Sequence, residues 1–110
     1  GTQRLARIVG LTKAKELCLT GGMVDAAEAL QLGILNKVCP PEMLLPETAA
    51  LAKKIASKSK HAVALIKSSI NKGTEMDLES AALFEIDCFG LCFSTAEQKA
   101  GMEAFVTKKK

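Results

Sequence analysis

Cysteine and histidine are the side chains in this sequence that could bind a metal ion or act as nucleophile and base. The four cysteines are Cys18, Cys39, Cys88 and Cys92, and His61 is the only histidine. No two cysteines form a CxxC pair and His61 is distant from all of them, so the spacing predicts no metal site. Cys88 and Cys92 lie four apart in a predicted helix, and we interpret them as small apolar packing residues in a reducing compartment. His61 is expected at the surface near a helix start.

Carboxylates and glycine-rich stretches predict no catalytic site either. The sequence contains no GxSxG, HExxH, Walker or GxGxxG motif. Glu85 and Asp87 lie two apart in a predicted helix, so their carboxylates point in different directions. The stretch TGG at residues 20–22 is explained by a helix end followed by a turn. The residues alone therefore predict no catalytic group.

Residues typical of helix starts and ends recur along the sequence. We therefore predict a mainly α chain with six or seven helices. One short strand is predicted at residues 34–38, ILNKV. Gly10, Gly21 and Gly33 are expected to end helices, and Pro46 is expected in the first turn of one. The residues expected to cap helix N-termini are Thr2, Thr12, Asp25, Asp77 and either Ser94 or Thr95.

Composition is that of a soluble globular domain, with 48% hydrophobic and 25% charged residues and a net charge of +3. No stretch is long and apolar enough to predict a membrane helix. The absence of Tyr and Trp and the modest charge disfavour nucleic-acid binding. Nearly every predicted helix has an apolar stripe, and such a set is typical of helices that pack on another layer or another subunit.

Several separated motifs resemble the enoyl-CoA hydratase/isomerase (crotonase) superfamily. They are GTQRL at the start of the chain, LTG, the stretch DAAEALQLGILNKV, and FSTAEQKAGMEAF near the end. They follow the order of the C-terminal region of that superfamily and are most similar to the short-chain enoyl-CoA hydratases, also called 3-hydroxybutyryl-CoA dehydratases. The resemblance covers essentially all 110 residues.

The resemblance implies a fold and an assembly. The chain would be the C-terminal helical region of the α/β crotonase (ClpP/crotonase-like) superhelix. Residues 1–40 would end the core, with short helices and one strand. Residues 41–110 would form a helical region for oligomerisation and coenzyme A contact. Family members form trimers or dimers of trimers, so a homo-oligomer is expected, with self-association of the 110-residue chain and neither nucleic-acid nor membrane partners.

The resemblance also implies a reaction. In hydratases of this family, two glutamates act on the water that adds to an enoyl thioester, and two backbone N–H groups polarise its carbonyl. In the family pattern these groups precede the position of Gly1, so we expect the parent protein to be a cytoplasmic lyase and this chain alone to be inactive. The substrate is acyl-coenzyme A, and no prosthetic group is expected. An enoyl-CoA isomerase, an acyl-CoA hydrolase and a non-catalytic helical oligomerisation module remain alternatives.

Coenzyme A contacts are the part of the family's site that the resemblance carries to this chain. Family members use aromatic residues and a lysine near the C-terminus for the adenine and phosphate end, and these positions match Phe89, Phe105 and Lys108. A phenyl ring can stack on adenine and an ammonium can pair with a phosphate. The alternative is that both phenylalanines are core residues and Lys108 is a solvated end residue. The family's usual Glu, Arg and Glu are replaced here by Thr107, Lys109 and Ala100.

Overall fold

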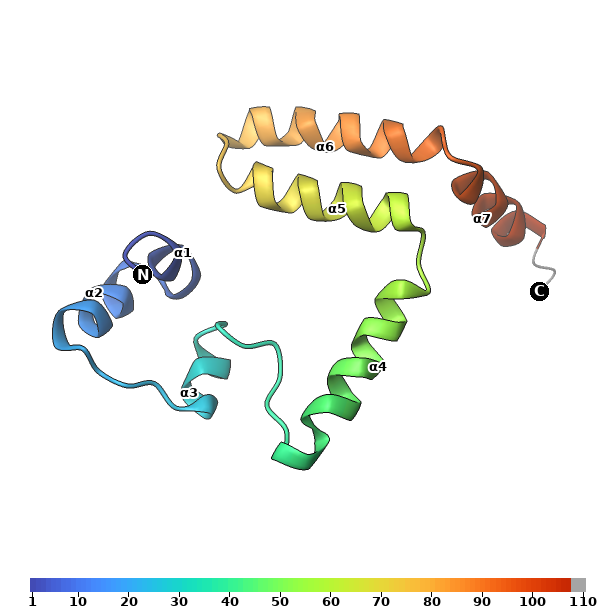
Figure 1. Cartoon of the computed structure of the whole chain (residues 1–110). Helices are drawn as coiled ribbons and strands as arrows, with labels where there is room; N and C mark the ends of the chain where they lie inside the picture. The colour runs from blue at the N-terminus through green and yellow to red at the C-terminus, as the bar shows by residue number, and fades with distance from the viewer. Residues whose placement is uncertain (108–110) are drawn as a thin grey trace. The chain divides into compact units, whose positions relative to one another are not determined.

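The structure of the chain is a computed structural model that describes residues 1–107. These residues form seven α-helices, within the six or seven that the sequence predicted, and one short 3₁₀ helix that it did not predict (Figure 1). Chain contacts divide them into two compact units, Gly1–Pro46 and the part from Glu47 onward. The functional labels given to residues 1–40 and 41–110 stay a prediction. The elements are α1 (Arg4–Val9), α2 (Leu11–Thr20), α3 (Ala26–Gln31), η1 (Pro41–Met43), α4 (Leu44–Ala56), α5 (Lys60–Gly73), α6 (Leu78–Phe93) and α7 (Ala96–Thr107).

Two glycines with positive φ set the limits of α2 in the first unit. Gly10 has φ 83° and separates α1 from α2, and Gly21 has φ 65°, the left-handed conformation predicted for it. The predicted cap Thr12 is wrong, because α2 begins at Leu11 directly after Gly10, which places Thr12 inside the first turn. The predicted cap Thr2 is also wrong, since Gln3 precedes α1 and makes no side-chain cap bond.

Helix α3 begins as predicted, at Asp25, whose side chain accepts a hydrogen bond of 2.8 Å from the backbone N–H of Glu28. The Glu28 carboxylate in turn pairs with Lys13 of α2, with a distance of 2.9 Å between Oε1 and Nζ. Lys13 also pairs with Glu16, at 2.8 Å. These carboxylates favour the charged ammonium, so the pKa of Lys13 is raised.

The strand predicted at residues 34–38 is wrong. The backbone N–H groups of Ile34 and Leu35 donate to the Ala29 carbonyl, at 2.9 and 3.3 Å, so this segment begins by closing the end of α3. Gly33, with φ 74°, turns the chain there. A strand also needs a neighbouring strand to pair its backbone, and residues 1–107 contain none.

The second unit is built around an antiparallel pair, α5 and α6 (Figure 1). Ser59 caps α5 by accepting a hydrogen bond from Ala62 N–H, at 3.3 Å. Asp77 caps α6 as predicted, accepting from Ser80 N–H at 2.9 Å. The Lys72 ammonium lies over the Phe84 ring, 5.5 Å from its centroid, and joins the two helices at this end.

Two further predictions about helix starts concern α4 and α7. Pro46 lies in the first turn of α4, where its missing N–H costs little. Of the two caps considered for the last helix, Thr95 is the one used, because its hydroxyl accepts a hydrogen bond of 3.2 Å from Gln98 N–H. Its own hydroxyl donates to the Cys92 carbonyl, at 2.8 Å, and so ties the start of α7 to the end of α6.

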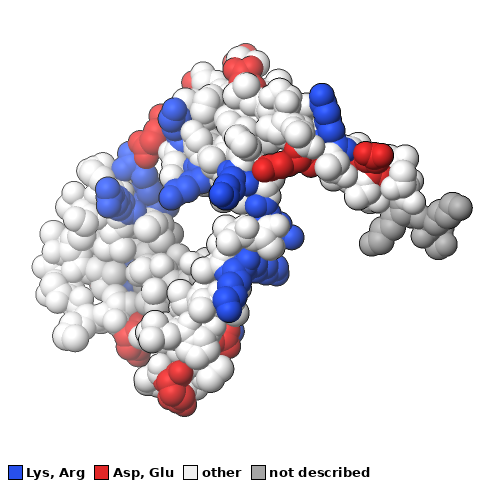
Figure 2. Space-filling view, turned by 45° about the vertical axis from the view of Figure 1, so that its right-hand side comes forward, with Lys and Arg blue, Asp and Glu red and all other residues white. Residues whose placement is uncertain are grey.

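Apolar side chains of the described residues are largely exposed. Only Ala14, Ala29 and Cys88 are buried among residues 1–107, whereas large aliphatic and aromatic residues on every α-helix face solvent. The side seen in Figure 2 has broad areas without Lys, Arg, Asp or Glu. The apolar stripes expected to need a partner are therefore open in this chain. Within residues 1–107, no helix combines the length and the hydropathy that crossing a bilayer requires.

Candidate functional site

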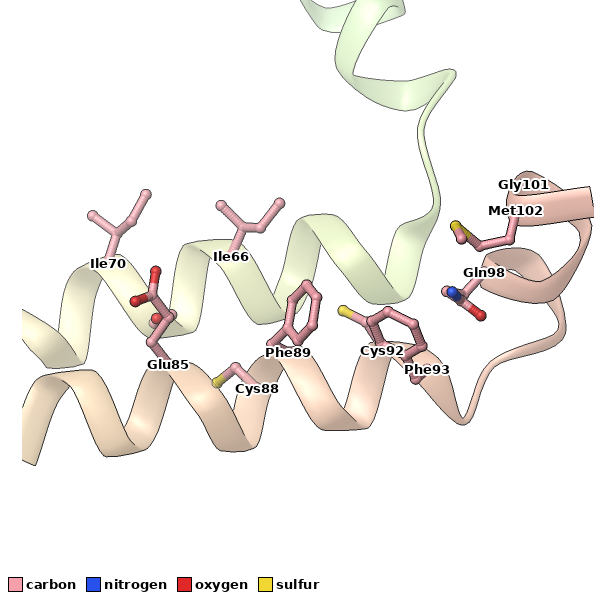
Figure 3. A pocket seen from close by; sticks show the side chains of 11 residues that line it. Ile66, Ile70, Glu85, Cys88, Phe89, Cys92, Phe93, Gln98, Gly101 and Met102 are labelled. Carbon is pink, nitrogen blue, oxygen red and sulfur yellow. The ribbon is translucent and has the colours of Figure 1, made fainter. Parts of the chain in front are cut away.

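An apolar cavity of about 680 Å³ lies in the second unit, where α5, α6 and α7 meet. Helix α6 contributes the largest share of its wall, α5 supplies one side and the first two turns of α7 close one end (Figure 3). The lining residues are Ile66, Ser69, Ile70, Glu85, Cys88, Phe89, Cys92, Phe93, Gln98, Gly101 and Met102.

Phe89 is the predicted site residue that lies in this cavity (Figure 3). Its ring packs at a tilt of 56° on Phe93, with 4.8 Å between the ring centroids. Phe89 is 63% exposed, so it is not a buried core residue of this chain. A partly exposed ring in an apolar wall can stack on a planar ligand, which fits the predicted contact with adenine.

Phe105 is not brought to the cavity by the described structure. Phe105 lies on α7 and is 77% exposed, but it is not one of the cavity residues. Lys108 lies outside the described residues. The coenzyme A contacts assigned to Phe89, Phe105 and Lys108 stay predictions.

A polar cluster joins the start of α5 to the start of α7. The Ser59 hydroxyl donates a hydrogen bond to Oε2 of Glu97, although 38 residues separate them in sequence. Nδ1 of His61 lies 3.6 Å from the same carboxylate oxygen. Each of these three residues belongs to a helix start, because Ser59 caps α5, His61 is in its first turn and Glu97 is in the first turn of α7.

The surroundings of Glu97 stabilise its ionised form. The hydrogen bond from Ser59 is the main cause, and it lowers the pKa of the Glu97 carboxyl below its ordinary value. Partial removal from water opposes this shift, while the His61 ring and the Lys60 ammonium add to it. The Glu97 side chain keeps 47% of its exposure, so solvent screens these interactions.

Serine, histidine and glutamate side chains in one cluster resemble the composition of a hydrolytic triad, but their arrangement differs. In a triad the histidine ring accepts the serine proton and the acid orients the ring. Here the Ser59 hydroxyl donates directly to Glu97, and His61 contacts the same oxygen. The Ser59 hydroxyl also caps α5. The cluster therefore suits a structural connection between two helices better than nucleophilic catalysis.

Sequence reasoning placed His61 correctly near a helix start but did not predict its neighbours, because it considered only local spacing. The sequence signal that could have predicted these neighbours is the presence of two consecutive helices of similar length, which can pair. Helices α5 and α6 have 14 and 16 residues, so antiparallel packing brings the start of α5 close to the end of α6. Glu97 follows α6 after a short turn and therefore reaches Ser59 and His61.

Metal-ligating groups and buried polar side chains are absent from residues 1–107. No three His, Cys, Asp or Glu side chains are grouped so that they could hold a metal ion, and no charged or polar residue is buried in this range. The four cysteines are free thiols, and Cys88, in the wall of the cavity, is the buried one. Two carboxylates of the kind that activate water in a closed site are not found in this part of the chain.

Comparison with known proteins gives consistent results over the whole chain. The family model described as enoyl-CoA hydratase/isomerase matches residues 1–110. The chain is 48% identical to crotonyl-CoA hydratase of Syntrophomonas wolfei and 46% identical to short-chain-enoyl-CoA hydratase of Clostridium acetobutylicum, in both cases over 110 residues. Each match covers 100% of this chain and 42% of the relative.

Solved structures agree with the sequence matches. The crystal structure of an enoyl-CoA hydratase subunit I from Geobacillus kaustophilus superimposes with a TM-score of 0.94 at 41% identity, covering 99% of this chain and 42% of that one. The chain thus spans about two fifths of the length of these relatives. The matches do not support the predicted placement in the C-terminal region, which stays a prediction.

Proposed function

The chain belongs to the enoyl-CoA hydratase/isomerase family, and from this premise we propose that it is part of an enzyme that hydrates short-chain trans-2-enoyl-CoA thioesters. The observation that carries the proposal is the 48% identity to crotonyl-CoA hydratase over all 110 residues. In the proposed reaction crotonyl-CoA takes up one water. The hydroxyl adds to C3, the remaining proton adds to C2, and the product is 3-hydroxybutyryl-CoA.

The groups that perform this chemistry are proposed to lie in the part of the relatives' length that this chain does not span. Adding water to a conjugated thioester requires a base for the water, an acid for C2 and hydrogen-bond donors for the carbonyl oxygen. The carboxylates of residues 1–107 are not buried, and none lines a closed polar site. No Glu of this chain is therefore assigned a catalytic role, and the 110-residue chain is expected to be inactive alone.

The contribution of this chain is proposed to be the coenzyme A side of the substrate site. The cavity that contains Phe89 offers an apolar wall with a partly exposed ring. Phe105 and Lys108 are the other proposed contacts, with the lysine pairing with phosphate as a point charge. The enzyme is proposed to act in the cytoplasm as a homo-oligomer, a trimer or a hexamer.

Loss of the crotonyl-CoA chromophore on hydration tests the proposal. The whole protein that contains this chain is expected to remove the absorbance of the conjugated thioester, whereas the purified 110-residue chain is expected to leave it unchanged. Turnover by the 110-residue chain would overturn the assignment of the catalytic groups to the rest of the protein. Hydrolysis of the thioester, followed as free thiol, or migration of the double bond would instead favour the hydrolase or isomerase alternative.

A further inference from the structure

The position of α7 depends on a small number of contacts. Helix α7 follows α6 after a short turn and lies beyond the end of the α5–α6 pair in Figure 1. Its packing on α6 is slight compared with that of α5 on α6, and its apolar residues Phe105 and Val106 are exposed. The polar cluster of Ser59, His61 and Glu97 is the contact that ties α7 to α5 across 38 residues of sequence.

One hydroxyl group serves both helices in this cluster. Ser59 Oγ accepts a hydrogen bond from Ala62 N–H and so caps α5, while its own proton is donated to Glu97. A hydroxyl has one donor and two acceptor sites, so both roles can be filled together. Glu97 also places a negative charge in the first turn of its own helix, where the positive end of the dipole favours it.

The residues next to Glu97 form one end of the apolar cavity. Gln98 follows it in the chain, and Gly101 lies one helical turn further, so both move with the first turn of α7. Both line the cavity together with Met102 and with Phe89 of α6 (Figure 3). Any tilt of α7 at its start therefore changes the width of the cavity at the end nearest Phe93.

We propose that Glu97 is a positioning residue, whose contacts with Ser59 and His61 hold the first turn of α7 against α5 and thereby fix the wall of the cavity that contains Phe89. The groups that face the Glu97 carboxylate are Ser59, Lys60 and His61 from α5. That this cavity receives the coenzyme A part of an acyl thioester rests on the proposed function, whereas the positioning of α7 does not.

Hydrogen exchange in the whole protein that contains this chain tests the positioning directly. Glu97→Gln keeps the size of the side chain but removes its charge and one of its acceptor oxygens. The expected result is about two- to fivefold faster exchange of the amides of residues 96–107, the range typical of a solvent-exposed ion pair. Exchange in α5 and α6 is expected to stay unchanged, which shows in the same measurement that the variant is folded.

Two further variants make the test specific. Glu103→Gln changes an exposed carboxylate on the same helix, away from Ser59, and is expected to leave the exchange of α7 unchanged. Ser59→Thr keeps the hydroxyl that donates to Glu97 and is expected to keep the protection of α7, whereas Ser59→Val is expected to lose it. Equal exchange of α7 in Glu97→Gln and the unaltered chain would overturn the proposal.

Kinetics of the whole protein separate this proposal from the proposed function. If the positioning role and the proposed function both hold, Glu97→Gln raises KM for crotonyl-CoA with little change in kcat. The reason is that the coenzyme A part of the substrate is bound less tightly while the reacting groups are unchanged. Faster exchange with an unchanged KM would keep Glu97 as a positioning residue and overturn the contact between this cavity and coenzyme A. A raised KM with unchanged exchange would overturn the positioning role.

Discussion

Phe89 is the residue whose environment ties the proposed substrate contact to the structure. Its ring is 63% exposed in the wall of an apolar cavity and packs on Phe93. In the whole protein, Phe89→Leu is expected to raise KM for crotonyl-CoA by about fivefold, because leucine keeps apolar contact but cannot stack on adenine. The change in kcat is expected to be small, since the proposed contact of the ring is with adenine and not with the reacting carbons.

Phe84→Leu is the matched control for this change. Phe84 lies on the same helix but outside the cavity, under the Lys72 ammonium. Losing that ring removes a cation–π contact outside the cavity, so KM is expected to stay within experimental error. Equal KM values for Phe89→Leu and the unaltered enzyme would assign Phe89 to packing, which is the alternative that the sequence left open.

Residue types at the candidate site were predictable from the sequence to different extents. The predicted coenzyme A contact of Phe89 came from the resemblance of FSTAEQKAGMEAF and its flanking helix to a known family. The cluster of Ser59, His61 and Glu97 was not predicted, because local spacing does not report contacts between segments 38 residues apart. Such contacts depend on how two helices pair, which in turn depends on apolar faces that several arrangements could satisfy.

Helix α6 provides a prediction at the scale of an element, through its cap Asp77. Hydrogen bonds from the Ser80 hydroxyl and then from the Ser80 backbone N–H lower the pKa of Asp77 below its ordinary value of 3.8. Because the folded pKa is lower than the unfolded one, the ionised cap stabilises α6 fully above pH 3.8. This stabilisation is lost as the pH falls through the lowered folded value.

Circular dichroism of Asp77→Ala against the unaltered chain measures this effect. At neutral pH the variant is expected to show less helical signal and a thermal midpoint lower by a few degrees. The difference between the two chains is expected to shrink toward the acidic end of the titration. Asp87→Ala, in the interior of the same helix, caps nothing and should show neither effect. A difference for Asp77→Ala that is independent of pH would contradict an ionised cap.

The elements themselves were largely predictable because their boundaries are encoded locally. Asp25, Asp77 and Thr95 cap helices through side-chain bonds to backbone groups three residues away, and Gly21 ends one in the left-handed conformation. The segment ILNKV failed as a strand for the opposite reason. Its apolar residues match a strand pattern, but pairing requires a second strand from elsewhere, and residues 1–107 supply none.

At the scale of the whole molecule, packing within the chain leaves most of the apolar faces of its helices uncovered. Small side chains, Ala14, Ala29 and Cys88, are the buried ones among residues 1–107. A set of amphipathic helices without a shared core is typical of a region that packs on other parts of a protein or on other subunits. The 42% share of the relatives' length that this chain spans fits that interpretation.

Self-association of the isolated chain follows from these open apolar faces. Leu83 and Ile86 are examples on α6, and both are more than half exposed. Covering such residues is favourable by about 1.5–3 kcal/mol for a fully buried aliphatic side chain. Light scattering over a concentration series is therefore expected to show a mass that rises above that of the 11.7 kDa monomer.

Ile86→Gln tests whether these apolar faces cause the association, because it removes apolar surface without changing the net charge. If α6 contributes to the contact, the apparent dissociation constant is expected to rise by about tenfold, which corresponds to the burial of one aliphatic side chain. Asn71→Gln, an exposed polar exchange on α5, should leave it unchanged. A monomer at every concentration would mean that the helices satisfy their apolar faces within one chain. The exposed arrangement described for residues 1–107 would then require a rearrangement in solution.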